Sequence, residues 1–309
     1  MPSIARGFGP AFHSRPAVVA RWLTTRFAID LARPRVMGIV NVTPDSFSDG
    51  GRHGHAATAM AHCERLCAEG AHLLDIGGES TRPGAQPPGE AEERARVMPV
   101  LRHALGLGVP ISVDTRHAAL MREALDLGVD VINDVNALRG DGAEQVLAAF
   151  PRAGVCLMHM RGAPATMQDA PDYADVVAEV ADFLSQRTAR LLSLGVEAAH
   201  IVLDPGIGFG KTLAHNIALH RGMPALLKLG YPVLVGWSNK SALGTMTGKP
   251  VQQRQSSSVA AALAAAQRGA RILRVHDVAA TVDALKTWQA LEGDPAVPGA
   301  NQGTGDDSP

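Results

Sequence analysis

The sequence predicts an α/β protein folded as a single (β/α)8 TIM barrel, and three observations support this prediction. Short apolar, β-branched runs alternate along the chain with longer segments rich in Ala, Leu, Glu and Arg. Such runs, separated by helices, are typical of parallel strands buried on both faces. The chain has eight of these units, as the barrel requires, and nearly every run ends in a polar side chain.

The expected strands can be placed in order along the chain. They lie at residues 35–42, 72–78, 109–115, 129–135, 154–160, 201–206, 231–237 and 271–277. Helices are expected between them, for example at 56–69, 117–127 and 173–194. A doubly wound open sheet is the competing arrangement. The number of units and the pattern of strand endings favour the barrel.

The strand endings predict one polar mouth. The polar residues at these ends are Asn41, Asp75 with Glu79, Asp114, Asn133, His159, Asp204, Ser238, and His276 with Asp277. In a barrel the carboxyl ends of all strands meet at one face, where active sites are built. Helix capping could explain one or two of them, for example Asp114, but not the whole set.

Two segments flank the expected barrel domain at 35–292. Residues 1–34 are expected to form an N-terminal extension with a short β-hairpin or plug, which continues to Val36 in "RFAIDLARPRV" and could close the bottom of the barrel. Residues 293–309 contain Gly, Pro and Asp with almost no apolar side chains, so we expect a disordered tail.

Composition limits which partners and which class of protein are expected. Hydrophobic residues make up 46% of the chain, which allows a sizeable core, and the formal net charge of −1 gives no support for nucleic-acid or anionic-membrane partners. No segment approaches the roughly 18 uninterrupted apolar residues of a membrane span. The three cysteines, Cys63, Cys67 and Cys156, suggest no disulfide framework. A soluble cytoplasmic enzyme is the default expectation.

The polar mouth divides by charge into two halves. One half would contain acceptors and a lysine that can hold a flat heterocycle: Asp114, Asn133, Asp204 and Lys240. The other half would cradle a phosphate or pyrophosphate, with room for a divalent ion: Asn41, Arg82, Arg274 and His276. The histidines have no recognisable metal spacing, so zinc is not expected.

Two short motifs belong to the same mouth. "DPGIGFGK", Asp204–Lys211, lacks the Walker A spacing, and its glycines would let backbone pass close to a bound ring, with Phe209 as an apolar wall. "SNKS" places Ser241 at the expected start of a helix, where backbone N–H groups favour a carboxylate or phosphate, although a plain N-cap is the alternative.

The ordered set of motifs resembles the dihydropteroate synthase family. The matching pieces are "MGIVNVTPDSFSDGG", "DIGGESTRPG", "ISVDT", "INDV", "LMHM", "LDPGIGFGK", "SNKS" and "RVHDV", which run from about Val36 to Asp277. The resemblance implies a barrel that is usually a homodimer. It also implies that 6-hydroxymethyl-7,8-dihydropterin pyrophosphate and 4-aminobenzoate are condensed, with Mg²⁺, to 7,8-dihydropteroate and pyrophosphate, and that the enzyme is a sulfonamide target.

The resemblance also implies three groups of site residues. The pterin would be held by Asp114, Asn133, Asp204 and Lys240, with Val135, Met158, Phe209 and Gly236 around it. The pyrophosphate would be held by Asn41, Arg82, Arg274 and His276, and Asn41 would also bind Mg²⁺. The 4-aminobenzoate pocket would be formed by Phe47, Thr81, Pro83, Phe209, Lys240 and Ser241.

These roles suggest a dissociative mechanism in which C–O cleavage precedes attack of the aromatic amine. Electrostatic stabilisation of the leaving anion and of the pterin cation would dominate. The segment Val40–Gly51, "VNVTPDSFSDGG", is far longer than a simple turn requires. Together with "GESTRPG" it would be a lid that excludes water from the cation.

One position departs from the family pattern. The family usually reads S-R-K-S where this chain has Ser238-Asn239-Lys240-Ser241, so Asn239 removes a positive charge near the 4-aminobenzoate side. We expect weaker contacts rather than lost chemistry, and an Asn239→Arg substitution should lower KM for 4-aminobenzoate. The alternatives are a catalytically silent pterin-binding paralogue and a pterin-dependent methyltransferase, which the anion cradle and the lid do not favour.

Overall fold

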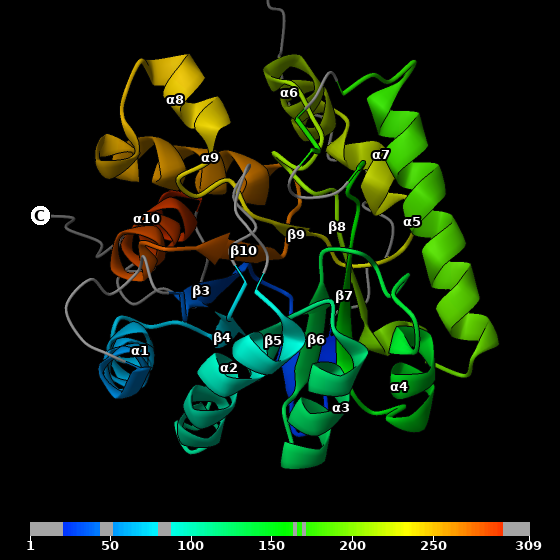
Figure 1. Cartoon of the computed structure of the whole chain (residues 1–309). Helices are drawn as coiled ribbons and strands as arrows, with labels where there is room; N and C mark the ends of the chain where they lie inside the picture. Colours follow the sequence, from blue (N-terminus) through cyan, green and yellow to red (C-terminus); the bar gives the residue numbers. More distant parts are fainter. Residues whose placement is uncertain (1–20, 44–51, 80–87, 163–165, 169–170, 293–309) are drawn as a thin grey trace, which may run out of the picture.

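The protein forms a ring of parallel strands surrounded by helices (Figure 1). The structure is a computed structural model, and it describes residues 21–43, 52–79, 88–162, 166–168 and 171–292. The expected tail at 293–309 lies outside these residues. No helix in the described part of the chain is long and apolar enough to cross a membrane.

Eight strands make the barrel. They are β3 (Arg35–Asn41), β4 (Leu73–Gly77), β5 (Ile111–Asp114), β6 (Val131–Asp134), β7 (Gly154–Met158), β8 (Ile201–Asp204), β9 (Leu234–Val235) and β10 (Ile272–Val275). Their order in the sheet is β8-β7-β6-β5-β4-β3-β10-β9. A single parallel bridge between Leu203 and Val233 joins the two edges of this sheet. Each strand lies inside one of the predicted runs, so the barrel prediction is confirmed.

Helices separate most successive strands and enclose the ring. They are α1 (Arg52–Ala68), α2 (Glu90–Ala104), α3 (Ala118–Leu127), α4 (Ala143–Ala149), α5 (Val176–Ser193), α6 (Leu213–Arg221), α7 (Met223–Leu227), α8 (Ser241–Thr247), α9 (Gln255–Gln267) and α10 (Val278–Leu291), with 3-10 turns at Ala198–His200 and Val251–Gln253. The helices predicted at 56–69, 117–127 and 173–194 correspond to α1, α3 and α5.

An antiparallel hairpin closes the bottom of the barrel, as predicted. Its strands are β1 (Arg21–Leu23) and β2 (Ala28–Asp30), so it begins before the predicted stretch, which contains only its second strand. Trp22 is fully buried and donates from Nε1 to the carbonyl of His200 at 2.8 Å. Arg26 pairs with the buried Asp130, which directly precedes β6, at 2.6 Å. The hairpin is therefore fastened to the amino ends of the strands.

Alternation along the strands explains why polar residues gather at the other end. A core cluster that includes Trp22 contains one residue from each of seven barrel strands: Met37, Leu73, Val131, Cys156, Val202, Leu234 and Ile272. Their strand neighbours, such as Ile132 and Leu203, pack instead in the large cluster that also contains helix residues. Since side chains alternate with a period of two, the next inward position on each strand is two residues further on, at the mouth.

Candidate active site at the barrel mouth

The positions two residues beyond the core cluster that includes Trp22 are polar on four of these seven strands. The polar residues are Asp75 on β4, Asn133 on β6, Asp204 on β8 and Arg274 on β10, whereas Ile39, Met158 and Gly236 occupy the other three positions. Asp75, Asn133 and Asp204 are buried. The barrel thus places the predicted acceptors and cation at one level of the same mouth.

Arg274 is the centre of this polar layer. Its Nε lies 2.6 Å from Asp75 Oδ2, and its Nη2 lies 2.7 Å from Asp114 Oδ2. Asn133 donates from Nδ2 to the same Asp75 oxygen at 3.0 Å. The two predicted halves of the mouth therefore meet at this ion pair, since Arg274 was assigned to the anion-binding half and Asp114 to the acidic half.

The charged groups of this layer change one another's pKa values. Burial raises the pKa of Asp114 above its ordinary value, and the Arg274 guanidinium opposes that rise. Burial alone would lower the pKa of Arg274, but Asp75 and Asp114 outweigh it and hold the guanidinium firmly charged. Asp114 is used in this ion pair rather than as a helix cap, since the residue preceding α3 is His117.

An apolar wall stands beside the polar layer. Val135, Met158, Met160 and Met167 form a separate buried cluster against which Phe209 packs. The Lys240 ammonium lies 4.3 Å from the centre of the Phe209 ring and donates a hydrogen bond to the carbonyl of Ile207. Burial lowers the pKa of Lys240 to about 7, although Asp204 opposes the shift. This arrangement offers a flat apolar surface edged by one cation and several acceptors.

The glycine-rich loop after β8 is packed tightly against protein backbone. Asp204 Oδ1 accepts from the N–H of Gly206 at 2.7 Å. Gly206 has φ +67°, and a Cβ there would lie 1.9 Å from the carbonyl oxygen of His159. The glycines were predicted to let backbone pass close to a bound ring, whereas at Gly206 the close approach is made to the segment after β7.

Lys211 fixes the position of this loop. It is buried, and its Nζ lies 2.9 Å from His159 Nδ1 and 3.0 Å from the carbonyl oxygen of Phe209. Burial lowers the pKa of Lys211 to about 7. The lysine therefore ties the Phe209 loop to the end of β7.

His276 and Ser238 meet where β9 and β10 end. The Ser238 hydroxyl accepts from the backbone N–H of His276 at 3.1 Å and lies 2.9 Å from its Nδ1. Ser238 is buried, whereas the His276 side chain is at intermediate exposure. The predicted anion ligand is thus held in place by a neighbouring hydroxyl.

The segment after Ser238 adopts an uncommon backbone conformation. Asn239 has φ +61°, a left-handed conformation in which asparagine is favoured over most residues. Arg254 donates from Nη1 to the carbonyl of Asn239 at 3.0 Å, and the N–H of Asn239 donates to Ser258 Oγ at 3.1 Å. Ser241 is exposed and is the first residue of α8, so the predicted helix start is confirmed.

The remaining predicted residues divide into two groups. Asn41 is the last residue of β3, and Gly236 directly follows β9, so both stand at the mouth. Four others lie outside the described residues, as does most of the predicted lid: Phe47, Thr81, Arg82 and Pro83. Their roles stay predictions.

Three residues that organise the mouth were not predicted from the sequence as site residues. Asp75 and Ser238 were recognised only as strand endings, and Lys211 only as the end of a motif. The available signal for Asp75 was a carboxylate within the apolar run "LLDIG". A buried carboxylate needs a charged or hydrogen-bonding partner, so its position alone pointed to a cation at the same level.

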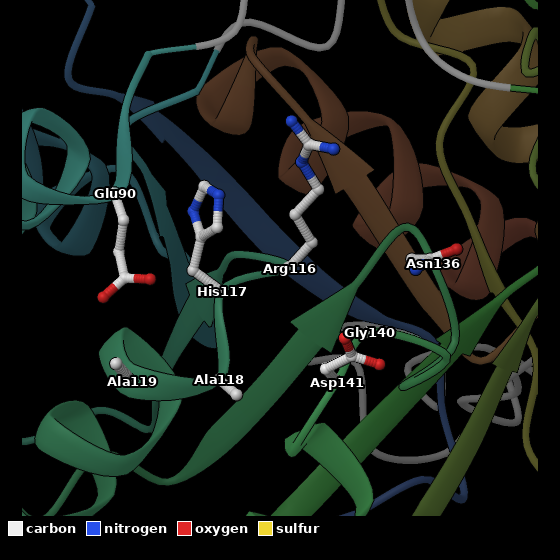
Figure 2. Close-up of a pocket in the computed structure, with 8 residues that line it drawn as sticks. All are labelled: Glu90, Arg116, His117, Ala118, Ala119, Asn136, Gly140 and Asp141. Carbon is white, nitrogen blue, oxygen red and sulfur yellow. The ribbon is translucent and has the colours of Figure 1, made fainter.

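A pocket of about 460 Å³ lies at the rim and not at the predicted mouth (Figure 2). Its lining comes from the starts of α2 and α3 and from the loop after β6: Glu90, Arg116, His117, Ala118, Ala119, Asn136, Gly140 and Asp141. Beside it, Glu79 and Glu93 lie close to His117, a grouping that could hold a cation. However, Glu79 already pairs with Arg116 at 3.0 Å and Glu93 with His117 at 2.6 Å. We interpret this group as a hydrogen-bonded network that contains the Arg116–Glu79 ion pair.

Proteins of known function are similar to this chain in sequence. Residues 37–276 match the family described as pterin binding enzyme. A dihydropteroate synthase from Neisseria meningitidis serogroup C is 55% identical over 274 residues, which covers 87% of this chain and 97% of that protein. The dihydropteroate synthase of Escherichia coli is 45% identical over 264 residues, covering 85% of this chain and 93% of the relative.

Solved structures agree with these sequence matches. The Xanthomonas albilineans dihydropteroate synthase with 4-aminobenzoic acid has a TM-score of 0.84 and 51% identity, covering 89% of this chain and 99% of that one. A structure of the enzyme from the same organism in complex with 7,8-dihydropteroate has a TM-score of 0.81 and 48% identity, covering 89% of this chain and 100% of the other. The Yersinia pestis enzyme in a sulfonamide drug complex has a TM-score of 0.83 and 44% identity, covering 88% and 99%.

Proposed function

This chain belongs to the dihydropteroate synthase family of pterin-binding enzymes, and we propose that its barrel mouth performs the reaction of that family. In this reaction 6-hydroxymethyl-7,8-dihydropterin pyrophosphate and 4-aminobenzoate give 7,8-dihydropteroate and pyrophosphate. The observation that carries the proposal is the polar layer around Arg274, where one cation stands among Asp75, Asp114 and Asn133 beside an apolar wall.

The pterin would lie flat against the wall. Its ring N–H and amino groups need acceptors, which Asp114, Asn133 and Asp204 supply, and its carbonyl needs a donor such as Lys240. Val135, Met158 and Phe209 would contact its faces, and Gly236 would lie beside it where β9 ends. The buried acceptors make this recognition stringent, because a wrongly placed ring would leave them unpaired.

The pyrophosphate would lie towards β3 and β10. Arg274 and His276 would donate to its oxygens, together with Asn41 and with Arg82, which lies outside the described residues. Arg274 remains charged because two carboxylates flank it. It can therefore stabilise the leaving anion without having to gain a proton during the reaction.

Magnesium fits the donor set at the end of β3. Asn41 offers an amide oxygen there, and Mg²⁺ is commonly bound by few protein oxygens together with water and substrate phosphates. The buried Asp75 Oδ1 has no hydrogen-bond partner among the described residues, so the layer contains a further oxygen donor. When bound, Mg²⁺ would neutralise negative charge on the pyrophosphate.

The 4-aminobenzoate would enter over Lys240 and Ser241. Phe209 would contact its ring, and Phe47, Thr81 and Pro83 would complete the pocket from the two segments outside the described residues. The carboxylate would rest near the exposed Ser241, where the first backbone N–H groups of α8 lie. Asn239 contributes no charge there.

The mechanism follows from the charge pattern. The C–O bond would break first, with its electron pair leaving on pyrophosphate, which the cationic side chains stabilise. The exocyclic carbon would carry a cation shared with the pterin ring, close to the carboxylates of the polar layer. The neutral amine nitrogen then forms the C–N bond and loses a proton, which the departing pyrophosphate can accept. Residues 44–51 and the "GESTRPG" segment would cover the cation and exclude water.

Three properties of the whole protein complete the proposal: a homodimer, a cytoplasmic location and inhibition by sulfonamides. On α9, Val259 and Ala260 are at intermediate and high exposure, which suits a partner subunit. Cys63, Cys67 and Cys156 are free, as expected in a reducing compartment. Sulfonamides would compete with 4-aminobenzoate for the pocket at Lys240 and Ser241.

Pyrophosphate release tests the proposed reaction. The purified protein is given the pterin pyrophosphate and Mg²⁺, with and without 4-aminobenzoate, and the products are separated. Turnover that needs 4-aminobenzoate and yields 7,8-dihydropteroate supports the proposal, and added sulfonamide should then raise the apparent KM for 4-aminobenzoate. Tight pterin binding without turnover would instead identify a silent paralogue.

A further inference from the structure

We propose that Ser238 is a positioning residue that fixes the protonation pattern of His276 and so aims its Nε2–H at the pyrophosphate. This inference rests on the proposed function only for the identity of the anion. The observation behind it is the pair of contacts between one hydroxyl and one histidine, 3.1 Å from the backbone N–H and 2.9 Å from Nδ1.

The first contact has a fixed direction. A backbone N–H can only donate, so the Ser238 oxygen is the acceptor in its bond with the N–H of His276. The hydroxyl hydrogen remains to be placed. Ser238 is only 6% exposed, and a buried hydroxyl hydrogen normally finds an acceptor.

The second contact supplies that acceptor. Among the described residues, the Ser238 hydroxyl has hydrogen bonds only to the backbone N–H and the ring Nδ1 of His276. The hydroxyl hydrogen therefore points to Nδ1, which must carry a lone pair. A neutral imidazole whose Nδ1 accepts a hydrogen bond has its proton on Nε2.

This tautomer decides whether the ring edge that would face the anion carries an N–H donor or a lone pair. An Nε2–H donates to a phosphate oxygen, whereas the opposite tautomer would present a lone pair and repel it. The bond to Ser238 also restrains ring rotation, since it ties the ring to its own backbone through one oxygen. Ser238 thus acts on the leaving group through His276 without contacting it.

The experiment uses the full-length protein with Ser238→Ala, Ser238→Thr, His276→Ala and the double variant Ser238→Ala/His276→Ala. The ring nitrogens of His276 are observed by nitrogen-15 NMR in the wild type, with the resonance assigned by its loss in His276→Ala. Binding of inorganic pyrophosphate with Mg²⁺ is measured by calorimetry, and kcat/KM is measured for the pterin pyrophosphate.

The proposal expects the Nε2–H tautomer in the wild type at pH 8. Losing one oriented hydrogen bond should weaken pyrophosphate binding about tenfold in Ser238→Ala. Ser238→Thr keeps the hydroxyl and should bind within about twofold of the wild type. In the His276→Ala background the Ser238→Ala change should have no further effect, because two residues acting as one unit are not additive.

Three outcomes would overturn it: an Nδ1–H or doubly protonated ring in the wild type, unchanged pyrophosphate binding in Ser238→Ala, or additive effects in the double variant. The NMR measurement decides the point even if Ser238→Ala fails to fold. It also separates the two proposals, since a wild-type protein that shows the Nε2–H tautomer without turnover would contradict only the proposed function.

Discussion

Asp75 holds Arg274 at the centre of the barrel, with Asp75 Oδ2 2.6 Å from the Nε atom of the guanidinium and the carboxylate wholly buried. The two residues are 199 positions apart in the chain, yet they belong to strands separated only by β3. The closed ring brings the first and last strand regions together. This pair therefore links the stability of the barrel to the position of a proposed catalytic cation.

Replacing Asp75 by Asn should affect both stability and activity. The substitution keeps the shape but removes the charge, so Arg274 and Asn133 lose their best acceptor. We expect the free energy of unfolding to fall by about 3 kcal/mol, as for other broken buried ion pairs. We also expect kcat/KM to fall by roughly 10²-fold because Arg274 is no longer oriented.

Urea unfolding and steady-state kinetics measure the two effects of Asp75→Asn. Glu123→Gln is the control, since Glu123 pairs with Arg94 on the surface and that pair should contribute little. Equal losses in the two variants, or a fully active Asp75→Asn enzyme, would contradict this role for Asp75.

Gly206 should tolerate no side chain. An alanine Cβ would overlap the carbonyl oxygen of His159, and this neighbour is backbone that cannot rotate away. Gly230 is the matched control, with φ +84° and no atom within 4 Å of an added Cβ. Gly230→Ala should cost only the strain of a left-handed alanine, about 1 to 2 kcal/mol.

Thermal unfolding distinguishes the two glycine variants. Gly206→Ala should be insoluble, or melt far below Gly230→Ala, and should lose pterin binding with its loop. Similar melting temperatures for the two variants would show that the segment after β7 can move aside, contrary to the packing described here.

Lys211 should make stability depend on pH. Burial lowers its pKa in the folded state to about 7, whereas the unfolded chain has the ordinary value of 10.5. Between these values the unfolded state binds more protons, so the free energy of unfolding contributed by this group rises with pH. Its contribution is complete above about pH 10.5 and is lost as the pH falls through 7.

The difference in unfolding free energy between wild type and Lys211→Met isolates this effect. It should grow in favour of the wild type from pH 7 to pH 10. Lys228→Met changes an exposed lysine, and its difference from the wild type should stay flat. A flat difference for Lys211→Met would mean that the buried lysine keeps its proton in the folded protein.

Asn239→Arg tests the departure from the family pattern. The added charge should lower KM for 4-aminobenzoate, while an Arg at φ +61° should cost up to about 1 kcal/mol of stability relative to Asn. Asn239→Gly is the control, because it suits the backbone without adding charge. Kinetics and thermal melting are measured together, and an unchanged or raised KM in Asn239→Arg would refute the expected contact.

The sequence was sufficient to predict the eight strands, because each is a short apolar run that ends in a polar side chain. It also placed Asn133, Asp204 and Arg274 at the mouth, since strand ends meet there in any barrel. It did not reveal that Arg274 pairs with Asp75 and Asp114, because that choice depends on which side chains share a level inside the ring. Strand register sets that level. The hairpin was expected within residues 1–34 and lies there, but its first strand precedes the stretch "RFAIDLARPRV" from which it was predicted. Its first strand is too short to show alternation.

The hairpin at the bottom of the barrel also constrains the order of assembly during synthesis. Trp22 is among the first of the described residues to leave the ribosome, but its hydrogen-bond acceptor at His200 follows 178 residues later. At 5 to 20 residues per second, this delay is roughly 10 to 35 seconds. For that time the indole has no native partner there, and an apolar strand pair stays open to other contacts. The bottom of the barrel therefore closes late, because Trp22 can make this hydrogen bond only after the chain has been synthesised beyond β7.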